Sequence, residues 1–257
     1  VLSKVISMQR REFNQLLNDI LKPHTIKDFC PNGLQVEGKN EIRTIVTGVT
    51  ASQALIDAAI EKKADAVLVH HGYFWKGESQ PITGMKKRRI GTLLAHDINL
   101  FAYHLPLDIH PVIGNNAKLA NLLDIEIETG LEPVTNSVAM KGRLKTPLTG
   151  SEFANKIAKV LNREPLSSVV RDEKINTIAL CTGGGQGYID LAAEQGIDAY
   201  LTGEASEQTI HSSREQNIDF FAAGHHATER YGIKALGELL AKEHGFDVSF
   251  IDIDNPV

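Results

Sequence analysis

The side chains that could bind metal ions gather in three short segments of this sequence, VHHG, HLPLD and HHATE. They are the histidines and carboxylates His70, His71, His104, Asp108, His225 and Glu229. In the second and third segments the carboxylate follows the histidine by four residues. Neutral imidazoles and carboxylates are common ligands of divalent zinc, manganese, iron and nickel. The three segments are therefore candidates for a metal site.

The elements that must position these side chains follow from the hydrophobic pattern. Short apolar runs alternate with segments of helical periodicity. Strands are predicted at 41–49, 64–69, 98–104, 174–181, 197–202, 218–223 and 246–253, and helices at 12–21, 52–63, 86–97, 114–124, 152–161, 187–196, 206–216 and 228–243. Such alternation predicts an α/β protein with substantially parallel sheets.

The two halves of the chain resemble each other. Residues 42–71 laid over 175–204 without a gap match at ten of thirty positions, where about two are expected by chance. An internal duplication explains this, and it predicts two similar α/β domains, residues 1–125 with 230–257 and residues 126–229. Ligands in open α/β sheets bind beyond the carboxyl ends of the strands, where the three segments lie. The metal site is therefore expected at the interface of the two domains.

The paired histidines suggest more than one ion. Side chains of adjacent residues in a strand point to opposite sides, so His70 and His71 would reach two neighbouring ions better than one. Two ions about 3.5–4 Å apart could generate hydroxide and hold developing charge on a substrate. A packed or hydrogen-bonded histidine pair is the alternative, and Pro106 disfavours a regular helix across HLPLD. The recurrence of the spacing in both halves favours metal binding.

Other residues and segments each allow two interpretations of their role. The loop CTGGGQG (181–187) could cradle a phosphate with its amides, but a tight strand-to-helix turn is the simpler reading. The basic run 86–89 could contact phosphates or nucleic acid, or form a solvated helix start. Glu204 stands where the duplication places His71, and it is either a substrate or second-layer group or a carboxylate at a helix start. Tyr73, Phe74 and Trp75 could line the approach to the metals or pack in the core.

Composition limits the function classes. The formal charge is −5, which argues against broad affinity for nucleic acid. No run reaches the roughly 20 apolar residues of a membrane helix, and Cys30 and Cys181 have no CxxC partner. A cytoplasmic protein without membrane association is expected. Met8 offers a natural start, which would make residues 1–7 an upstream extension.

Several longer motifs resemble one family. They are PNGLQVEG (31–38), VTGVTASQ (46–53), VHHGYFWKG (69–77), HLPLDIHP (104–111), CTGGGQ (181–186), TGEASEQTIH (202–211) and GHHATER (224–230). Together they resemble the NIF-three-like family, in particular its YbgI group of bacterial proteins often labelled GTP cyclohydrolase I type 2 homologues. The resemblance runs from about Phe13 to the C-terminus.

The resemblance implies two similar α/β domains, a toroidal homohexamer built as a trimer of dimers, and a site for two divalent ions per subunit. Carried onto matching positions, it implies the ligands His70, His71, Asp108, His225 and Glu229, with Glu229 bridging. His104 would support the site and move protons, and Glu204 is a second catalytic candidate. Zinc, manganese, iron, nickel and magnesium are not distinguished by such a ligand set.

These features lead to three functional hypotheses. The first is a dinuclear metal-dependent hydrolase of a nucleotide or nucleotide-like heterocycle, as in GTP ring opening. The second is a metal-dependent phosphoesterase acting on damaged nucleotides or nucleic acid, which the basic run 86–89 and a ring-shaped cavity would favour. The third is a non-enzymatic metal-binding ring with a regulatory or scaffold role.

Overall fold

The computed structural model describes residues 6–257, so most of the extension expected before Met8 lies outside the described residues. The chain forms two compact units. The first contains the chain through Leu107 together with Gly232–Asp254, and the second contains Asp108–Tyr231 with Asn255–Val257. Each unit combines a mixed β-sheet with helices, which confirms the predicted α/β class.

The division between the units differs from the predicted domain junction at 125–126. The difference arises from the helix α5 (Asn115–Leu122), which was assigned to the first domain. Leu119 and Ala120 of this helix are buried against Leu144 and Phe153 of the second unit. The return of the chain to the first unit at Gly232 lies close to the predicted return at 230.

The first unit is built around a five-stranded sheet. The strands of the unit, two of which lie outside this sheet, are β1 (Met8–Gln9), β2 (Gly33–Val36), β3 (Glu41–Ile42), β4 (Thr44–Thr50), β5 (Ala66–His71), β6 (Asn99–Ala102) and β13 (Asp247–Phe250). Its helices are α1 (Arg10–Leu21), the 3-10 helix η1 (Pro23–Thr25), α2 (Gln53–Glu61) and α3 (Gly84–Ala95), and it shares α4 (Leu105–Asp108) and α9 (His225–His244) with the second unit. The sheet order is β13-β4-β5-β6-β2, with only β2 antiparallel, and β1 and β3 form a separate pair.

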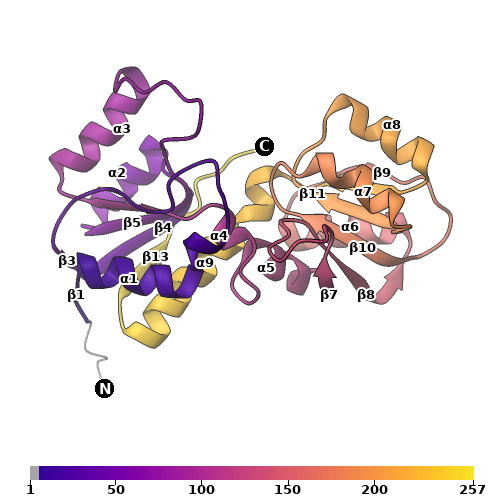
Figure 1. Cartoon of the computed structure of the whole chain (residues 1–257), viewed down its shortest axis with the longest axis horizontal. Helices are drawn as coiled ribbons and strands as arrows, with labels where there is room; N and C mark the ends of the chain where they lie inside the picture. Colours follow the sequence, from indigo (N-terminus) through magenta and orange to yellow (C-terminus); the bar gives the residue numbers. More distant parts are fainter. Residues whose placement is uncertain (1–5) are drawn as a thin grey trace. The chain divides into compact units, whose positions relative to one another are not determined.

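Helices cover both faces of this sheet (Figure 1). Val67 and Val69 of β5 face α2 and α3, where they join Leu55 and Leu93 in one core cluster. On the opposite face, Phe13 of α1 packs edge-on against Phe101 with 5.1 Å between ring centroids. Burial on both faces explains why the strand AVLV is continuously apolar rather than alternating.

The second unit has a six-stranded sheet of order β7-β8-β10-β11-β12-β9. Its strands are β7 (Ile125–Gly130), β8 (Met140–Leu148), β9 (Leu166–Ser168), β10 (Ile175–Cys181), β11 (Ala199–Thr202) and β12 (Asp219–Ala222). Its helices are α5, α6 (Gly150–Leu161), the 3-10 helix η2 (Gln186–Tyr188), α7 (Ile189–Glu194) and α8 (Glu207–Gln216). The central strands β10, β11 and β12 are parallel, and the remaining pairings are antiparallel.

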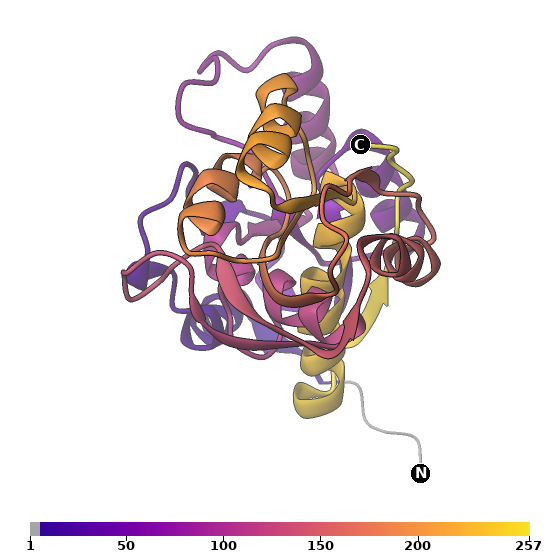
Figure 2. The same ribbon diagram turned by 90° about the vertical axis from the view of Figure 1, so that its right-hand side faces the viewer.

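The two faces of this second sheet have separate cores. Ile178 and Leu180 pack with Phe153 of α6, whereas Ala179 and Cys181 pack with the side of α7. The orange helices α7 and α8 can be followed in Figure 2. The alternation along β10 is the period of two that a strand imposes.

The parallel strands of both units pair in the same register. Ile45 lies opposite Ala66 in the first sheet, and Ile178 lies opposite Ala199 in the second. The sequence comparison of the two halves aligned the same residues. Ile178 follows Ile45, and Ala199 follows Ala66, by the same number of residues. The similarity of the halves therefore extends to strand pairing.

Among the described residues, no helix combines the length and the apolar character that crossing a membrane requires.

Candidate metal centre

Three histidines of the first unit form a cluster. His70 and His71 end β5, and His104 follows the neighbouring parallel strand β6. One ligating atom from each lies within 4.8 Å of the others. The ring centroids are 4.5 Å apart for His70 and His71 and 5.2 Å apart for His70 and His104. The carboxyl ends of adjacent parallel strands thus bring together residues 33 and 34 positions apart in the chain.

The expected orientation of the paired histidines was wrong. His70 and His71 were expected on opposite sides of the strand, yet their rings lie close together with an interplanar angle of 39°. His71 is the last residue of β5, and Gly72 follows it. At the end of a strand, both side chains can lean along the strand direction past the edge of the sheet. The two rings therefore lie next to each other and not on opposite sides of the strand, as had been predicted.

Hydrogen bonds orient these imidazoles. Nδ1 of His70 lies 2.9 Å from the carbonyl oxygen of Tyr103. Because a carbonyl only accepts, Nδ1 carries the proton and Nε2 is the basic nitrogen. Nδ1 of His71 lies 3.2 Å from the hydroxyl of Thr50. Metal-binding histidines are commonly held in this way, with one nitrogen on a protein group and the other turned to the ion.

His104 is held by a carboxylate that the sequence reading did not single out, Asp28. Nδ1 of His104 lies 2.7 Å from Oδ1 of Asp28, whose side chain is 3% exposed. The same carboxylate accepts from the backbone N–H of Leu105 and from the amide of Asn32, each at 2.9 Å. Burial opposes ionisation, but the hydrogen bonds of His104 and Asn32 outweigh it and lower the pKa of Asp28 to about 2. His104 therefore faces a carboxylate that is ionised at neutral pH.

Cys30 lies within ligating range of Asp28 and His104 as well. Burial and the charge of Asp28 raise the pKa of the Cys30 thiol to about 12. The thiolate is the form that binds metals, so this group is a weaker candidate than the three histidines.

The segment HLPLD contains one helical turn, α4, although Pro106 was expected to disfavour it. Proline is tolerated in a first turn because the N–H it lacks would have no partner inside the helix. The turn begins after His104, whose carbonyl accepts from the N–H of Leu107 at 2.9 Å. Asp108 ends the turn, and it belongs to the second unit.

Two buried carboxylates lie close together in the second unit. Asp108 is 4% exposed and Glu229 is 3% exposed. A carboxylate oxygen of each lies within 4.8 Å of the other. Asp108 accepts hydrogen bonds from the amide of Asn115 at 2.8 Å and from the hydroxyl of Thr182 at 3.2 Å. Buried like charges at this range favour a nearby cation, which a divalent ion would supply.

His225 connects Glu229 to the third carboxylate, Glu204. His225 and Glu229 are one turn apart on α9, with 3.0 Å between Nε2 and Oε2. Two ligands of one ion at bond lengths near 2.0–2.2 Å have donor atoms about this far apart. Nδ1 of His225 lies 2.5 Å from Oε1 of Glu204. Burial opposes protonation, but Glu229 and Glu204 together raise the pKa of His225 to about 9.

The glycine loop 181–187 uses three of its backbone amides within the protein and passes close to Glu229. Thr182 and Gly183 donate their backbone N–H groups to Asn116 and Thr228, and Gly185 donates to Thr202. Those amides are thus used within the protein. Gly183 has a positive φ of 71°, and a Cβ on it would lie 2.1 Å from Oε1 of Glu229 and 2.9 Å from Nε2 of His225. Only glycine leaves room for these two atoms of Glu229 and His225.

The donor sets of both units fit divalent metals. The first unit offers imidazoles whose Nδ1 atoms are held by protein groups, and the second offers two buried carboxylates with an imidazole beside one of them. Glu204 contacts His225 and is placed to orient its ring.

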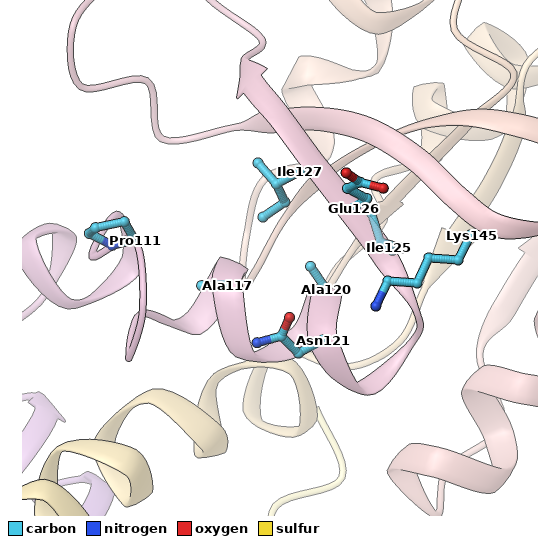
Figure 3. A pocket seen from close by; sticks show the side chains of 8 residues that line it. All are labelled: Pro111, Ala117, Ala120, Asn121, Ile125, Glu126, Ile127 and Lys145. Carbon is cyan, nitrogen blue, oxygen red and sulfur yellow. The ribbon is translucent and has the colours of Figure 1, made fainter.

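The basic run and the cavity drawn in Figure 3 do not share residues with these donors. Lys86 of the run is paired with Glu78 at 2.8 Å. The cavity has a volume of about 460 Å³ and lies in the second unit, where Ala120, Glu126 and Lys145 are among the residues that line it (Figure 3). No histidine lines it. It therefore does not belong to the metal centre.

Comparison with known proteins identifies the family. A model of the family described as Duf34/NIF3 (NGG1p interacting factor 3) matches residues 8–256. Proteins named "GTP cyclohydrolase 1 type 2 homolog" from Haemophilus influenzae and Escherichia coli K12 are 64% and 56% identical over 250 residues, covering 97% of this chain and all of theirs.

Solved structures agree with this. A structure titled "Structural genomics, protein ybgI, unknown function" is 55% identical with a TM-score of 0.94, and a Thermus thermophilus protein is 33% identical with a TM-score of 0.87. Each comparison covers 97% of this chain and 100% of the other. The chain belongs to the Duf34/NIF3 family.

Proposed function

We propose that this protein is a metal-dependent hydrolase that acts on a nucleotide or a nucleotide-like heterocycle. The proposed ligands of two divalent ions are the residues His70, His71, Asp108, His225 and Glu229. The observation that carries the proposal is the pair of buried carboxylates, Asp108 and Glu229, with oxygens within 4.8 Å of each other and His225 beside Glu229. Burial of two such groups side by side is costly unless a cation offsets their charge.

When bound, the ions would supply Lewis acidity and an activated water for hydrolysis. The protein's own contribution is orientation and proton transfer. Tyr103 holds the ring of His70 through its carbonyl, and Glu204 holds the ring of His225. His104, with Nδ1 on Asp28, can accept a proton at Nε2 and return it while the carboxylate stabilises the imidazolium. We assign the proton-transfer role to His104 and an orienting role to Glu204.

The names of the similar proteins suggest the substrate to test first, GTP. Opening its imidazole ring adds water at C8 and breaks the bond from C8 to N9, which leaves a formamide. A second water breaks the bond from C8 to N7, so that C8 leaves as formate and a diaminopyrimidine remains. Formate release therefore reports the whole reaction, and two waters are consumed for each formate.

The experiment loads the protein separately with zinc, manganese, iron, nickel and magnesium and measures bound metal per chain and formate released from GTP. We expect about two ions per chain with at least one metal, and formate release that requires the metal. His104→Gln should retain the metal and lower formate release by about 10²–10⁴-fold, because it removes the proton-transfer group.

A matched control is His211→Gln, which changes an exposed histidine of α8 that pairs with Glu207 on the same helix. It should behave as the unaltered protein. Metal binding without formate release from GTP, but with phosphate release from a panel of nucleotides, would replace ring opening with phosphoester hydrolysis. Metal binding without turnover of either kind would support a non-enzymatic role, and failure to bind metal at these residues would refute the proposal.

A further inference from the structure

The loop that follows His71 encloses a second cavity, in the first unit, with a volume of about 450 Å³. Aromatic and charged side chains line it, among them Phe74, Trp75, Lys76, Glu78 and Lys86. Its size falls within the roughly 300–1,000 Å³ of small-molecule sites. The metal donors do not line it, but one of its walls contacts them.

That wall is Trp75. Its ring packs edge-on against His104 with 4.8 Å between centroids, and it lies 6.0 Å from the ring of His71. The indole N–H donates to the carbonyl of Gly72 at 3.1 Å, which fixes the ring. A molecule in the cavity would therefore lie beside the histidine cluster.

The backbone of the neighbouring residue is strained. Phe74 has a φ of 65°, a conformation that bulky side chains rarely adopt, and its side chain remains 36% exposed. Glu78 holds it there by accepting the N–H of Phe74 at 2.8 Å, and the ammonium of Lys86 pairs with the same carboxylate oxygen. Strain of this kind persists where the surroundings enforce it, and it is common at ligand-binding sites. A glycine at this position would relieve the strain. The presence of phenylalanine instead indicates that its phenyl ring has a role in the cavity.

The two lysines that line the cavity differ in whether their ammonium groups are free to bind a ligand. Lys86 is engaged with Glu78, with the carbonyl of Ser79 at 3.0 Å and with the face of the Phe74 ring at 5.0 Å. Lys76 is exposed, and its ammonium makes no ion pair or hydrogen bond with the residues the structure describes. One uncommitted cation beside two aromatic rings suits a planar ring that carries an anionic group.

We propose that this cavity binds the substrate of the metal centre as a phosphorylated heteroaromatic molecule, with its ring against Phe74 and Trp75 and its phosphate on Lys76. The inference rests on the proposed function, since it takes the ligand to be the molecule that is hydrolysed. It assigns recognition to the loop 72–80, whereas the metal ligands carry out the reaction. Stacking on an aromatic side chain contributes about tenfold or more to the affinity for a base.

Trp75 is the only tryptophan in the chain, so its fluorescence reports the cavity directly. The metal-loaded protein is titrated with GTP, with guanosine and with inorganic tripolyphosphate. We expect saturable quenching by GTP, weaker binding of guanosine because it lacks the phosphates, and no quenching by tripolyphosphate. Metal content is measured in every sample.

Variants separate the two contacts. Phe74→Ala should weaken GTP and guanosine binding by about tenfold, and Phe74→Tyr should restore it because the ring is retained. Lys76→Ala should weaken GTP binding and leave guanosine binding unchanged. The control Lys87→Ala alters an exposed lysine of α3 that does not line the cavity.

The pocket assignment is overturned if GTP binds by equilibrium dialysis without changing Trp75 fluorescence, if it does not bind, or if Phe74→Ala and Lys76→Ala bind it as tightly as Lys87→Ala. Failure of the proposed function gives a different result. In that case GTP quenches Trp75 and the variants weaken it as expected, but no formate or phosphate is released.

Discussion

Nδ1 of His104 lies 2.7 Å from Oδ1 of Asp28, and Nδ1 of His225 lies 2.5 Å from Oε1 of Glu204. In both units, the histidine after an equivalent strand thus has a carboxylate on the same ring nitrogen. The carboxylates come from different places, Asp28 from the segment before β2 and Glu204 from the segment after β11. Both units orient an imidazole in the same way with different parts of the chain.

The pairing of Asp28 predicts a pH-dependent contribution to stability. The folded pKa of about 2 lies below the ordinary value of 3.8, so the contribution is present above pH 4 and is lost as the pH falls toward 2. The difference of nearly two units corresponds to about 2 kcal/mol for this nearly buried group. Asp28→Asn should therefore lower the free energy of unfolding by about 2 kcal/mol at pH 7, measured by urea denaturation.

The same comparison at pH 2.5 provides the internal control. There the two proteins should differ by much less, because most of the contribution of the ionised Asp28 has gone. A difference that stays constant from pH 7 to pH 2.5 would mean that Asp28 stabilises the fold by its shape and not by its charge.

Much of the arrangement was readable from the sequence. The strands that carry His70, His104 and His225 toward one end of each sheet follow from apolar runs, which depend on local residue types. The predicted similarity of the halves agrees with the equal strand registers, since Ile45–Ala66 and Ile178–Ala199 are equivalent pairs. The histidines stood out because their spacing to a carboxylate recurs.

Other features could not be read from local patterns. Asp28 lies in an irregular segment, 76 residues before the histidine that it orients, and only tertiary structure joins them. The short antiparallel strands β2 and β9 were missed, because three or four residues on a sheet edge carry little periodicity. The mutual approach of the His70 and His71 rings was also missed, since the rule of alternating sides describes the middle of a strand and not its last residue. For Asp28, the available signal in the sequence was the segment DFCPNG, in which Asp28 and Asn32 lie close together.

Asp65 and Asp198 provide a test of the equivalence of the two units. Each carboxylate accepts the backbone N–H groups of two consecutive residues at the start of a neighbouring strand, at distances of 2.9–3.0 Å. Removal of either carboxylate leaves two donors without their acceptor, at a cost of about 1–3 kcal/mol. Asp65→Ala and Asp198→Ala should therefore destabilise the protein by similar amounts in thermal unfolding. A large effect of one and none of the other would show that the contacts are equal in geometry only.

Gly183 is predicted to be indispensable for the carboxylate site. In Gly183→Ala the new Cβ would meet Glu229 and His225, and the positive φ adds strain, so we expect a loss of about 1–3 kcal/mol in stability and a lower metal content. Gly187→Ala is the matched control, because a Cβ there meets nothing within 4 Å. Thermal unfolding and metal analysis of both variants check this. Equal metal content in the two would contradict the close packing of Glu229 on the glycine loop.

Glu229 should be the carboxylate on which metal binding depends most. Glu229→Gln keeps the size of the side chain but removes a charge that, together with Asp108, would offset the metal. We expect the bound metal per chain to fall, and thermal stability without metal to stay the same or rise, because one buried charge is gone. Glu207→Gln on α8 is a control with an exposed carboxylate. A decrease in stability without loss of metal would assign Glu229 a structural role instead.

Substitutions of Glu204 test whether this residue orients a metal ligand or binds the metal itself. Glu204→Ala removes the acceptor on Nδ1 of His225, which should weaken metal binding by about 10–100-fold without changing the number of ions bound. Glu204→Gln retains an oxygen that can accept from Nδ1 but loses the charge, so its affinity should fall between those of Glu204→Ala and the unaltered protein. Competition with a chromophoric chelator measures all three. If the affinity of Glu204→Ala equals that of the unaltered protein, the hydrogen bond does not tune the imidazole. If Glu204→Ala instead binds fewer ions at saturation, Glu204 is itself a ligand, and the proposed set of five must be extended.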